Sequence, residues 1–283
     1  MQSVCIAGLS AALRLGCSKE QTAIIPTYIH IDSFHFKGDP SIKLDSLTNI
    51  NAVWVYYNSN PIGVFDLPAT FPVLGSGAGT LTVLPVIAVN GLNNQEAVYP
   101  FYKNDSFSFE AAPGRVINHM PITSWYPATT VYTIDSFNVL HTGFTKWGSN
   151  VGMIVNTADS LRYNGAMTGG IFLNAVTDSC IDSTSRAFPI APGSTSFIEF
   201  DYTSNIPFEL SMQANLASLA STAPSFVAGV MPADHWKKFY LYVSDFAART
   251  GGTDYNLFIK ATLPINRSKG RVLLANIKLL SIK

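Results

Sequence analysis

From Tyr28 onward the sequence consists of short runs rich in Val, Ile, Thr, Tyr and Phe, separated by Gly, Pro, Asn and Asp. Runs of about four to eight such residues between turn residues are typical of β-strands joined by tight turns. Only the stretch from Leu210 to Ser221 has helical spacing, and its Ser, Asn and Thr content and the nearby Pro224 disfavour a helix there. The pattern therefore predicts an all-β protein.

The 283 residues suffice for two ordinary domains or one large β domain. Pro127, Thr129 and Thr130 interrupt the strand pattern after Trp125-Tyr126, and a new β series begins at Val131. Because domain boundaries fall in such interruptions, we predict two domains, residues 28–126 and 131–283.

The clearest local element of the first domain is a hairpin. Residues 52–57 and 62–66 read as its two strands, and Asn58-Ser59-Asn60-Pro61 as the turn between them. A Gly-rich turn at 75–79 then leads into an apolar strand at 80–89. About seven short strands before residue 126 predict an immunoglobulin-like (Ig-like) β-sandwich.

The residues around this hairpin also carry a family resemblance. Val53-Trp54-Val55-Tyr56, followed by Asn60-Pro61-Ile62-Gly63-Val64-Phe65-Asp66-Leu67-Pro68 and the Gly-rich turn, resembles PEGA-type modules. These are small β-sandwich repeats common in bacterial surface proteins. The resemblance covers about residues 50–90 and implies an extracytoplasmic β-sandwich.

The second domain has eight or nine strand-like runs, among them 135–140, 197–202, 238–243 and 272–280, which suit a two-sheet jelly roll. Three strings, 169–173, 235–240 and 273–279, resemble the galactose-binding-like jelly rolls that include many carbohydrate-binding modules. The family often has an acidic residue before the Asn of the last string, in some members near a structural calcium, but Ala275 stands there. We therefore expect no cofactor, with a structural calcium ion at this corner as the alternative.

The N-terminal segment resembles a lipoprotein signal. A short apolar run from Val4 to Leu15 ends in Gly16-Cys17, and Ser18-Lys19-Glu20 follow. This predicts a signal segment at residues 1–17, lipidation at Cys17 and a tether at 18–27; an ordinary N-terminal helix is the alternative. With the β domains, it resembles Bacteroidota outer-membrane lipoproteins. That resemblance implies a cell-envelope location, anchored to the outer membrane by lipid and either periplasmic or surface-exposed.

Composition and motif spacing exclude several function classes. Lys plus Arg and Asp plus Glu both number 18, and no long basic run is present, so no nucleic-acid partner is expected. The five His and three Cys have no zinc spacing, no nucleophile motif occurs, and we predict no catalytic or metal site and no enzyme. A carboxylate pair for glycoside cleavage is the hardest to exclude; Glu199 and Asp201 share one strand face, which we expect to be solvent-exposed.

Binding of a glycan is the function that the residues favour. Proteins hold sugars with exposed aromatic rings flanked by polar side chains. The second domain offers five such candidates: Trp147, Arg162, Tyr163, Asn164 and Trp236. Trp147 and Tyr163 lie in turn-rich sequence where we expect exposed rings, whereas Trp236 opens a strand and is also compatible with the core. The alternative is a structural or assembly component that contacts outer-membrane proteins, because the aromatic content is 12% and the charged fraction only 13%.

Overall fold

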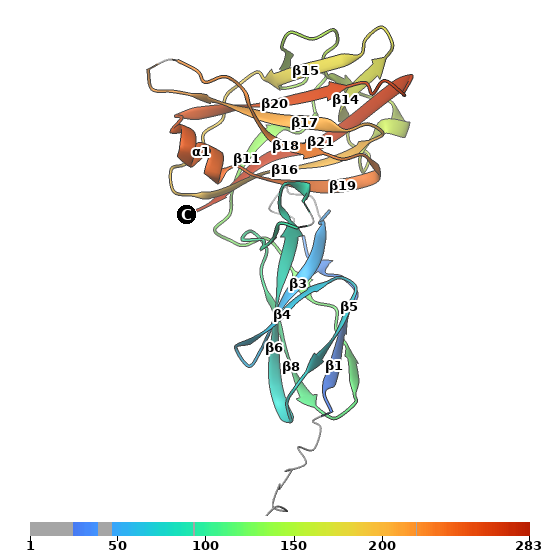
Figure 1. Cartoon of the computed structure of the whole chain (residues 1–283), viewed down its shortest axis with the longest axis vertical. Coiled ribbons are helices and arrows are strands. Elements are labelled where there is room, and N and C mark those ends of the chain that lie inside the picture. Colours follow the sequence, from blue (N-terminus) through green and yellow to red (C-terminus); the bar gives the residue numbers. More distant parts are fainter. Residues whose placement is uncertain (1–24, 39–46, 93, 219) are drawn as a thin grey trace, which may run out of the picture.

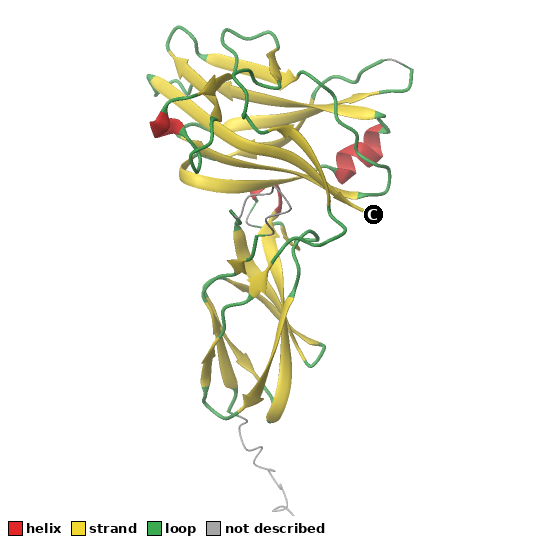
Figure 2. Ribbon diagram, turned by 180° about the vertical axis from the view of Figure 1, so that it is seen from behind, coloured by secondary structure: helices red, strands yellow, loops and turns green. Residues whose placement is uncertain are grey.

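The computed structural model describes residues 25–38, 47–92, 94–218 and 220–283 as two lobes along one long axis (Figure 1). Strands dominate both lobes (Figure 2), so the all-β prediction is confirmed. In the described residues the one α-helix is α1 (Ser244–Thr250), and the weak helical candidate at 210–221 begins as strand instead. The predicted signal segment, Cys17 and most of the tether lie outside the described residues.

The N-terminal unit holds ten strands and the short 3-10 turn η1 (Val89–Gly91). The strands are β1 (Thr27–Ile31), β2 (His35–Phe36), β3 (Ile50–Tyr57), β4 (Asn60–Asp66), β5 (Ala69–Val73), β6 (Gly77–Ala88), β7 (Glu96–Val98), β8 (Asp105–Ala111), β9 (Val116–Asn118) and β10 (Ile122–Thr123). Its strands form three sheets: β5-β1-β9, the two-stranded sheet β10-β2, and β4-β3-β6, in which β7 and β8 both pair with β6. The Ig-like assignment of this unit stays a prediction.

The predicted hairpin is confirmed as β3 and β4. Asn58 and Ser59 have φ values of 48° and 68°, which is the backbone that a two-residue hairpin turn requires. The Gly-rich segment has a packing role: a Cβ atom at Gly75 or Gly79 would lie 2.5 or 2.4 Å from the Tyr57 side chain. Glycine there lets Tyr57 lie directly on the backbone that leads into β6.

The C-terminal unit is a two-sheet sandwich built from eleven strands. They are β11 (Thr130–Asp135), β12 (Phe144–Lys146), β13 (Ile154–Asn156), β14 (Thr168–Asn174), β15 (Ser179–Thr184), β16 (Thr195–Ser204), β17 (Phe208–Asn215), β18 (Ser225–Val230), β19 (Ala233–Tyr242), β20 (Asp254–Thr262) and β21 (Lys269–Ile282). The six-stranded sheet has the order β13-β14-β21-β16-β19, with β11 also on β21; the five-stranded sheet has the order β12-β15-β20-β17-β18. This agrees with the predicted jelly-roll sandwich.

One predicted strand, 135–140, is wrong. The buried carboxylate of Asp135 accepts hydrogen bonds from the N–H groups of Phe137 and Gly143, at 2.8 and 2.6 Å, and from the Thr142 hydroxyl at 2.9 Å. Phe137 has a φ of 53°, outside the strand region. The polar side chain at the end of β11 therefore folds the chain into a compact loop, and Phe137 enters the core from that loop.

The N-terminal unit packs against the outer face of the six-stranded sheet and against its edge at β19 (Figure 1). Tyr99, Phe101 and Tyr102 form one buried cluster with Phe197 and Tyr240 of the sandwich. Within η1, Gly91 has a φ of 70°, and a Cβ atom there would lie 2.7 Å from the Phe239 ring. The two units thus share an interface with a buried aromatic cluster.

Across the part of the chain that the structure describes, no helix has the length and hydropathy needed to span a membrane.

Candidate functional site

The five-stranded sheet has an outer face that the N-terminal unit leaves free. Leu257, Ile259 and Ala261 of β20 lie in the core, so the alternating residues Phe258 and Lys260 point outward. Pairing sets Phe258 opposite Ser183 of β15 and Ser211 of β17, and Ser211 opposite Phe226 of β18. A single row of side chains therefore crosses four strands of this free face.

Trp147 stands over this row at one edge of the sheet. It directly follows β12, and its backbone N–H donates to the Ile181 carbonyl at 2.7 Å, which holds the residue against β15. Its ring meets the Phe258 ring edge-on, with centroids 5.4 Å apart, and remains 51% exposed. Phe258 is only 3% exposed although it points outward, since Trp147 shields it. At the opposite edge Phe226 is 65% exposed.

Polar side chains fill the free face between its two exposed aromatic rings. Lys260 and Glu209 face each other across β20 and β17 with a 3.1 Å ion pair, and both are about half exposed. Gln213 and Asn256 sit opposite each other on the same two strands. This arrangement suits a flat ligand that has an apolar face and a polar rim.

The other predicted ligand residues do not join Trp147. Tyr163, expected to be exposed, is only 6% exposed because its ring packs on Trp236, with centroids 4.6 Å apart. Trp236 belongs to β19 of the other sheet. It is half-buried, which is compatible with the alternative that it packs against the core. The expectation of an exposed Tyr163 ring was therefore wrong, and the five candidates do not form one site.

The polar neighbours of Tyr163 have structural partners or turn positions. The Arg162 guanidinium pairs with Asp159 at 2.9 Å and donates to the carbonyls of Gly165 and Thr157. Asn164 is exposed in a turn with a φ of 48°, a conformation that asparagine tolerates better than most residues. Arg162 thus stabilises the loop that carries Tyr163, and Asn164 occupies a turn position in that loop.

Glu199 and Asp201 are not on a solvent-exposed face, and that expectation was wrong. They are 1% and 0% exposed, beneath the N-terminal unit. The Lys238 ammonium lies 3.5 Å from Glu199 and 3.1 Å from Asp201, and the Asn276 amide donates to Asp201 at 2.9 Å. The hydroxyl of Tyr99 donates to Glu199, and burial beside this carboxylate raises the pKa of Tyr99 well above its usual value. Glu199 thus links the two units through Tyr99, and Asp201 supports the same buried network from within the sandwich.

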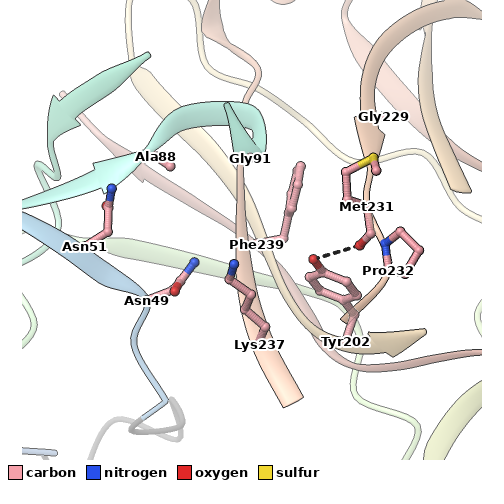
Figure 3. A pocket seen from close by; sticks show the side chains of 10 residues that line it. All are labelled: Asn49, Asn51, Ala88, Gly91, Tyr202, Gly229, Met231, Pro232, Lys237 and Phe239. Atoms are coloured by element: carbon pink, nitrogen blue, oxygen red, sulfur yellow. Dashed lines mark hydrogen bonds between the residues drawn. The ribbon is translucent and has the colours of Figure 1, made fainter. Parts of the chain in front are cut away.

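A small cavity of about 130 Å³ lies between the units, and Figure 3 shows its walls. Asn49, Asn51 and Gly91 line it from the N-terminal side, and Lys237 and Phe239 line it from β19. The Tyr202 hydroxyl closes one end by donating to the Met231 carbonyl at 3.2 Å. A cavity of this size admits only a few water molecules, so it is a packing gap at the interface rather than a substrate site.

The described cysteine is a core residue. Cys180 is fully buried, and burial raises the pKa of its thiol to about 12, so it is a poor nucleophile at neutral pH. Among the described residues no cluster of three His, Cys, Asp or Glu side chains has the geometry of a metal site. At the corner where calcium was the alternative, Ala275 is buried and the Asn276 amide is committed to Asp201.

No family model and no curated protein matches the chain. Among solved structures, similarity is found to a family 30 carbohydrate-binding module, at 13% identity and a TM-score of 0.40, covering 54% of this chain and 89% of that module. A variant of a family 29 carbohydrate-binding module, complexed with cellulohexaose, is similar at 16% identity and a TM-score of 0.34, covering 55% and 93%. Identities and TM-scores this low carry no information about the ligand of this chain.

Proposed function

We propose that this protein is a non-enzymatic glycan-binding protein whose site is the free face of the five-stranded sheet. The observation that carries the proposal is the half-exposed Trp147 ring, braced edge-on by Phe258 at the margin of a β surface. An exposed tryptophan fixed in one orientation loses little freedom when a ligand stacks on it.

The chemistry of the free face suits neutral sugars. A pyranose ring presents a C–H face that stacks on an aromatic ring and a rim of hydroxyl groups that needs hydrogen-bond partners. Lys260 and Glu209 flank the row from Phe258 to Phe226 on one side, and Gln213 flanks it on the other. A chain of several sugars lying across the strands meets both aromatic edges. The outer face of the other sheet lacks this access where the N-terminal unit covers it.

The test is affinity gel electrophoresis of the full chain in a panel of soluble neutral polysaccharides. We expect retention by at least one of them and roughly tenfold weaker retention of Trp147→Ala, the factor that about 1.4 kcal/mol of lost stacking represents. Trp54→Ala is the matched control, because Trp54 is 37% exposed on β3 of the N-terminal unit and lies away from the site. No retention on any polysaccharide, or an equal loss in the control, would contradict the proposal.

The location proposed with this function is the cell envelope, with a lipid anchor at Cys17. Gly16-Cys17 at the end of a short apolar run supports it. Several acyl chains would be needed for lasting attachment. Labelling of cells with radioactive palmitate should mark the wild-type protein and not Cys17→Ser; equal labelling of both would rule out this anchor.

A further inference from the structure

A concave site lies on the C-terminal unit, outside the free face. It is a cleft of about 510 Å³ between the end of β16, the start of β19, and the start of β21 with the loop before it. Three strong cations line it, Lys237, Arg267 and Arg271, together with His235. They come from two segments more than 25 residues apart in sequence, so the fold gathers them.

The positive charge in this cleft is not neutralised by the protein. Asp234 is the one acid in its lining, and its carboxylate is hydrogen-bonded to His235 at 2.7 Å. Within the described ranges, Lys237, Arg267 and Arg271 make no ion pair. The whole chain has equal numbers of acidic and basic residues, so this local excess of cations is not a consequence of overall charge.

Hydrogen bonds hold one wall of the cleft in place. The N–H of Arg271 donates to the Asn205 side-chain oxygen at 2.7 Å, and the Arg271 carbonyl accepts from the Asn205 N–H and the Ser204 hydroxyl, both at 3.1 Å. Among described residues, no hydrogen bond uses the Asn205 side-chain nitrogen. This wall therefore presents the side-chain amide N–H groups of Asn205 as hydrogen-bond donors, beside the hydrogen-bonded backbone of Arg271.

We infer that this cleft binds an acidic polysaccharide through its carboxylate or sulfate groups. The guanidinium forks of Arg267 and Arg271 match such oxyanions in geometry as well as in charge. A hollow with the amide donor of Asn205 suits the sugar hydroxyls that surround each acidic group. This inference does not depend on the proposed function, because none of the cleft residues belongs to the free face.

The experiment measures binding of the full chain to polygalacturonate and to dextran sulfate, with unsubstituted dextran as the neutral reference, by isothermal titration calorimetry. The two acidic polymers distinguish carboxylate from sulfate. We expect binding to at least one of them, weakened at least about tenfold in Arg267→Gln/Arg271→Gln. Raising NaCl from about 0.05 to about 0.3 M should weaken the binding as well, because the contacting charges are exposed.

Three further variants test whether binding depends on the charge of this cleft in particular. Asp234→Asn removes the one acid of the cleft and should tighten binding by about two- to fivefold. Arg249→Gln repeats one of the two Arg→Gln changes on an exposed arginine in the last turn of α1, outside the cleft, and should leave binding unchanged. Trp147→Ala should also leave it unchanged, so that failure of this inference and failure of the free-face proposal remain distinguishable.

Vesicles that contain about 30% phosphatidylglycerol test the competing hypothesis of a membrane partner, because anionic membranes attract exposed basic residues. Met231, next to the cleft residue Pro232, is 71% exposed, so a membrane surface is the competing partner. Binding to vesicles that is lost in the double arginine variant, with no binding to either acidic polymer, would overturn the inference. Equal binding of both acidic polymers by the wild type and the double variant would overturn it too.

Discussion

The two outer faces of the C-terminal sandwich carry similar residues in opposite surroundings. On the six-stranded sheet, Lys238 pairs with Glu199 and Asp201, and all three are at most 2% exposed. On the five-stranded sheet, Lys260 pairs with Glu209, and both side chains are about half exposed. The difference arises from the N-terminal unit, which covers the first face and leaves the second to solvent. Charge pattern alone therefore does not tell which face of such a sandwich is available to a ligand.

The two ion pairs should differ in energy as well. Removing one partner of a buried ion pair leaves an uncompensated charge and typically costs about 3–5 kcal/mol, whereas an exposed pair contributes about 0–1 kcal/mol. The aromatic rings around the buried pair, among them Tyr99, Phe101 and Phe197, exclude the water that would otherwise solvate it. The covered face should thus be sensitive to single charge removals and the free face tolerant of them.

The largest expected effect is that of Lys238→Met. Methionine fills a similar volume but leaves Asp201 and Glu199 without this ammonium, so we expect the free energy of unfolding to fall by about 3–5 kcal/mol. Lys260→Met on the free face is the matched variant and should change it by less than about 1 kcal/mol. Urea denaturation followed by tryptophan fluorescence measures both.

A triple variant separates lost charge balance from lost packing. Lys238→Met/Glu199→Gln/Asp201→Asn removes the carboxylate charges that the single variant leaves behind, so it should be less destabilised than Lys238→Met alone. If the triple variant is the less stable of the two, packing rather than charge dominates this face. Equal effects of Lys238→Met and Lys260→Met would break the comparison between the faces.

Local sequence patterns predicted the elements whose structure is set by nearby residues. The hairpin of β3 and β4 follows from two strand-like runs around a predicted turn at residues 58–61, of which the structure uses Asn58 and Ser59, both with positive φ, as the turn. The strands of the sandwich follow from the same period, as in β17, where Phe208, Leu210 and Met212 alternate into the core. The strand predicted at 135–140 failed because a polar side chain, Asp135, organises a loop from residues up to eight positions away.

The candidate site depended on contacts that sequence neighbours do not reveal. Trp147 and Tyr163 both lie in turn-rich sequence, yet only Tyr163 is covered, by Trp236 from a strand more than 70 residues later. The apolar run Leu257-Phe258-Ile259 is typical of a strand buried on both faces. In the structure Phe258 points outward, and Trp147 covers it. The aromatic run Tyr99-Pro100-Phe101-Tyr102 was the available signal for the interface that buries Glu199 and Asp201.

The smallest expected effect concerns Asp182, a buried aspartate of the five-stranded sheet. Whereas Asp201 has the Lys238 ammonium at 3.1 Å, Asp182 is held mainly by the backbone N–H of Met153, at 2.5 Å. Burial raises the pKa of Asp182, and this outweighs the lowering by the Met153 hydrogen bond, by Cys180 and by the charge of Lys146. The folded protein therefore retains a proton on Asp182 in a pH range where the unfolded chain has already lost it.

This predicts that Asp182 lowers stability as pH rises from the ordinary aspartate pKa through its raised folded value, since the folded state binds the extra proton there. Asp182→Asn keeps an oxygen for the Met153 N–H and cannot ionise. Its free energy of unfolding should lie within about 1 kcal/mol of the wild type at about pH 4, should exceed it increasingly as pH rises above the ordinary aspartate pKa, and should level off once folded Asp182 has lost its proton. Urea midpoints across this range, with exposed Asp159→Asn as a control that should follow the wild-type curve, measure the divergence. Parallel curves for Asp182→Asn and the wild type would mean that the sandwich solvates Asp182 well enough to keep its ordinary pKa. The contrast between an aspartate paired with Lys238 and one held mainly by a backbone N–H would then have no energetic consequence.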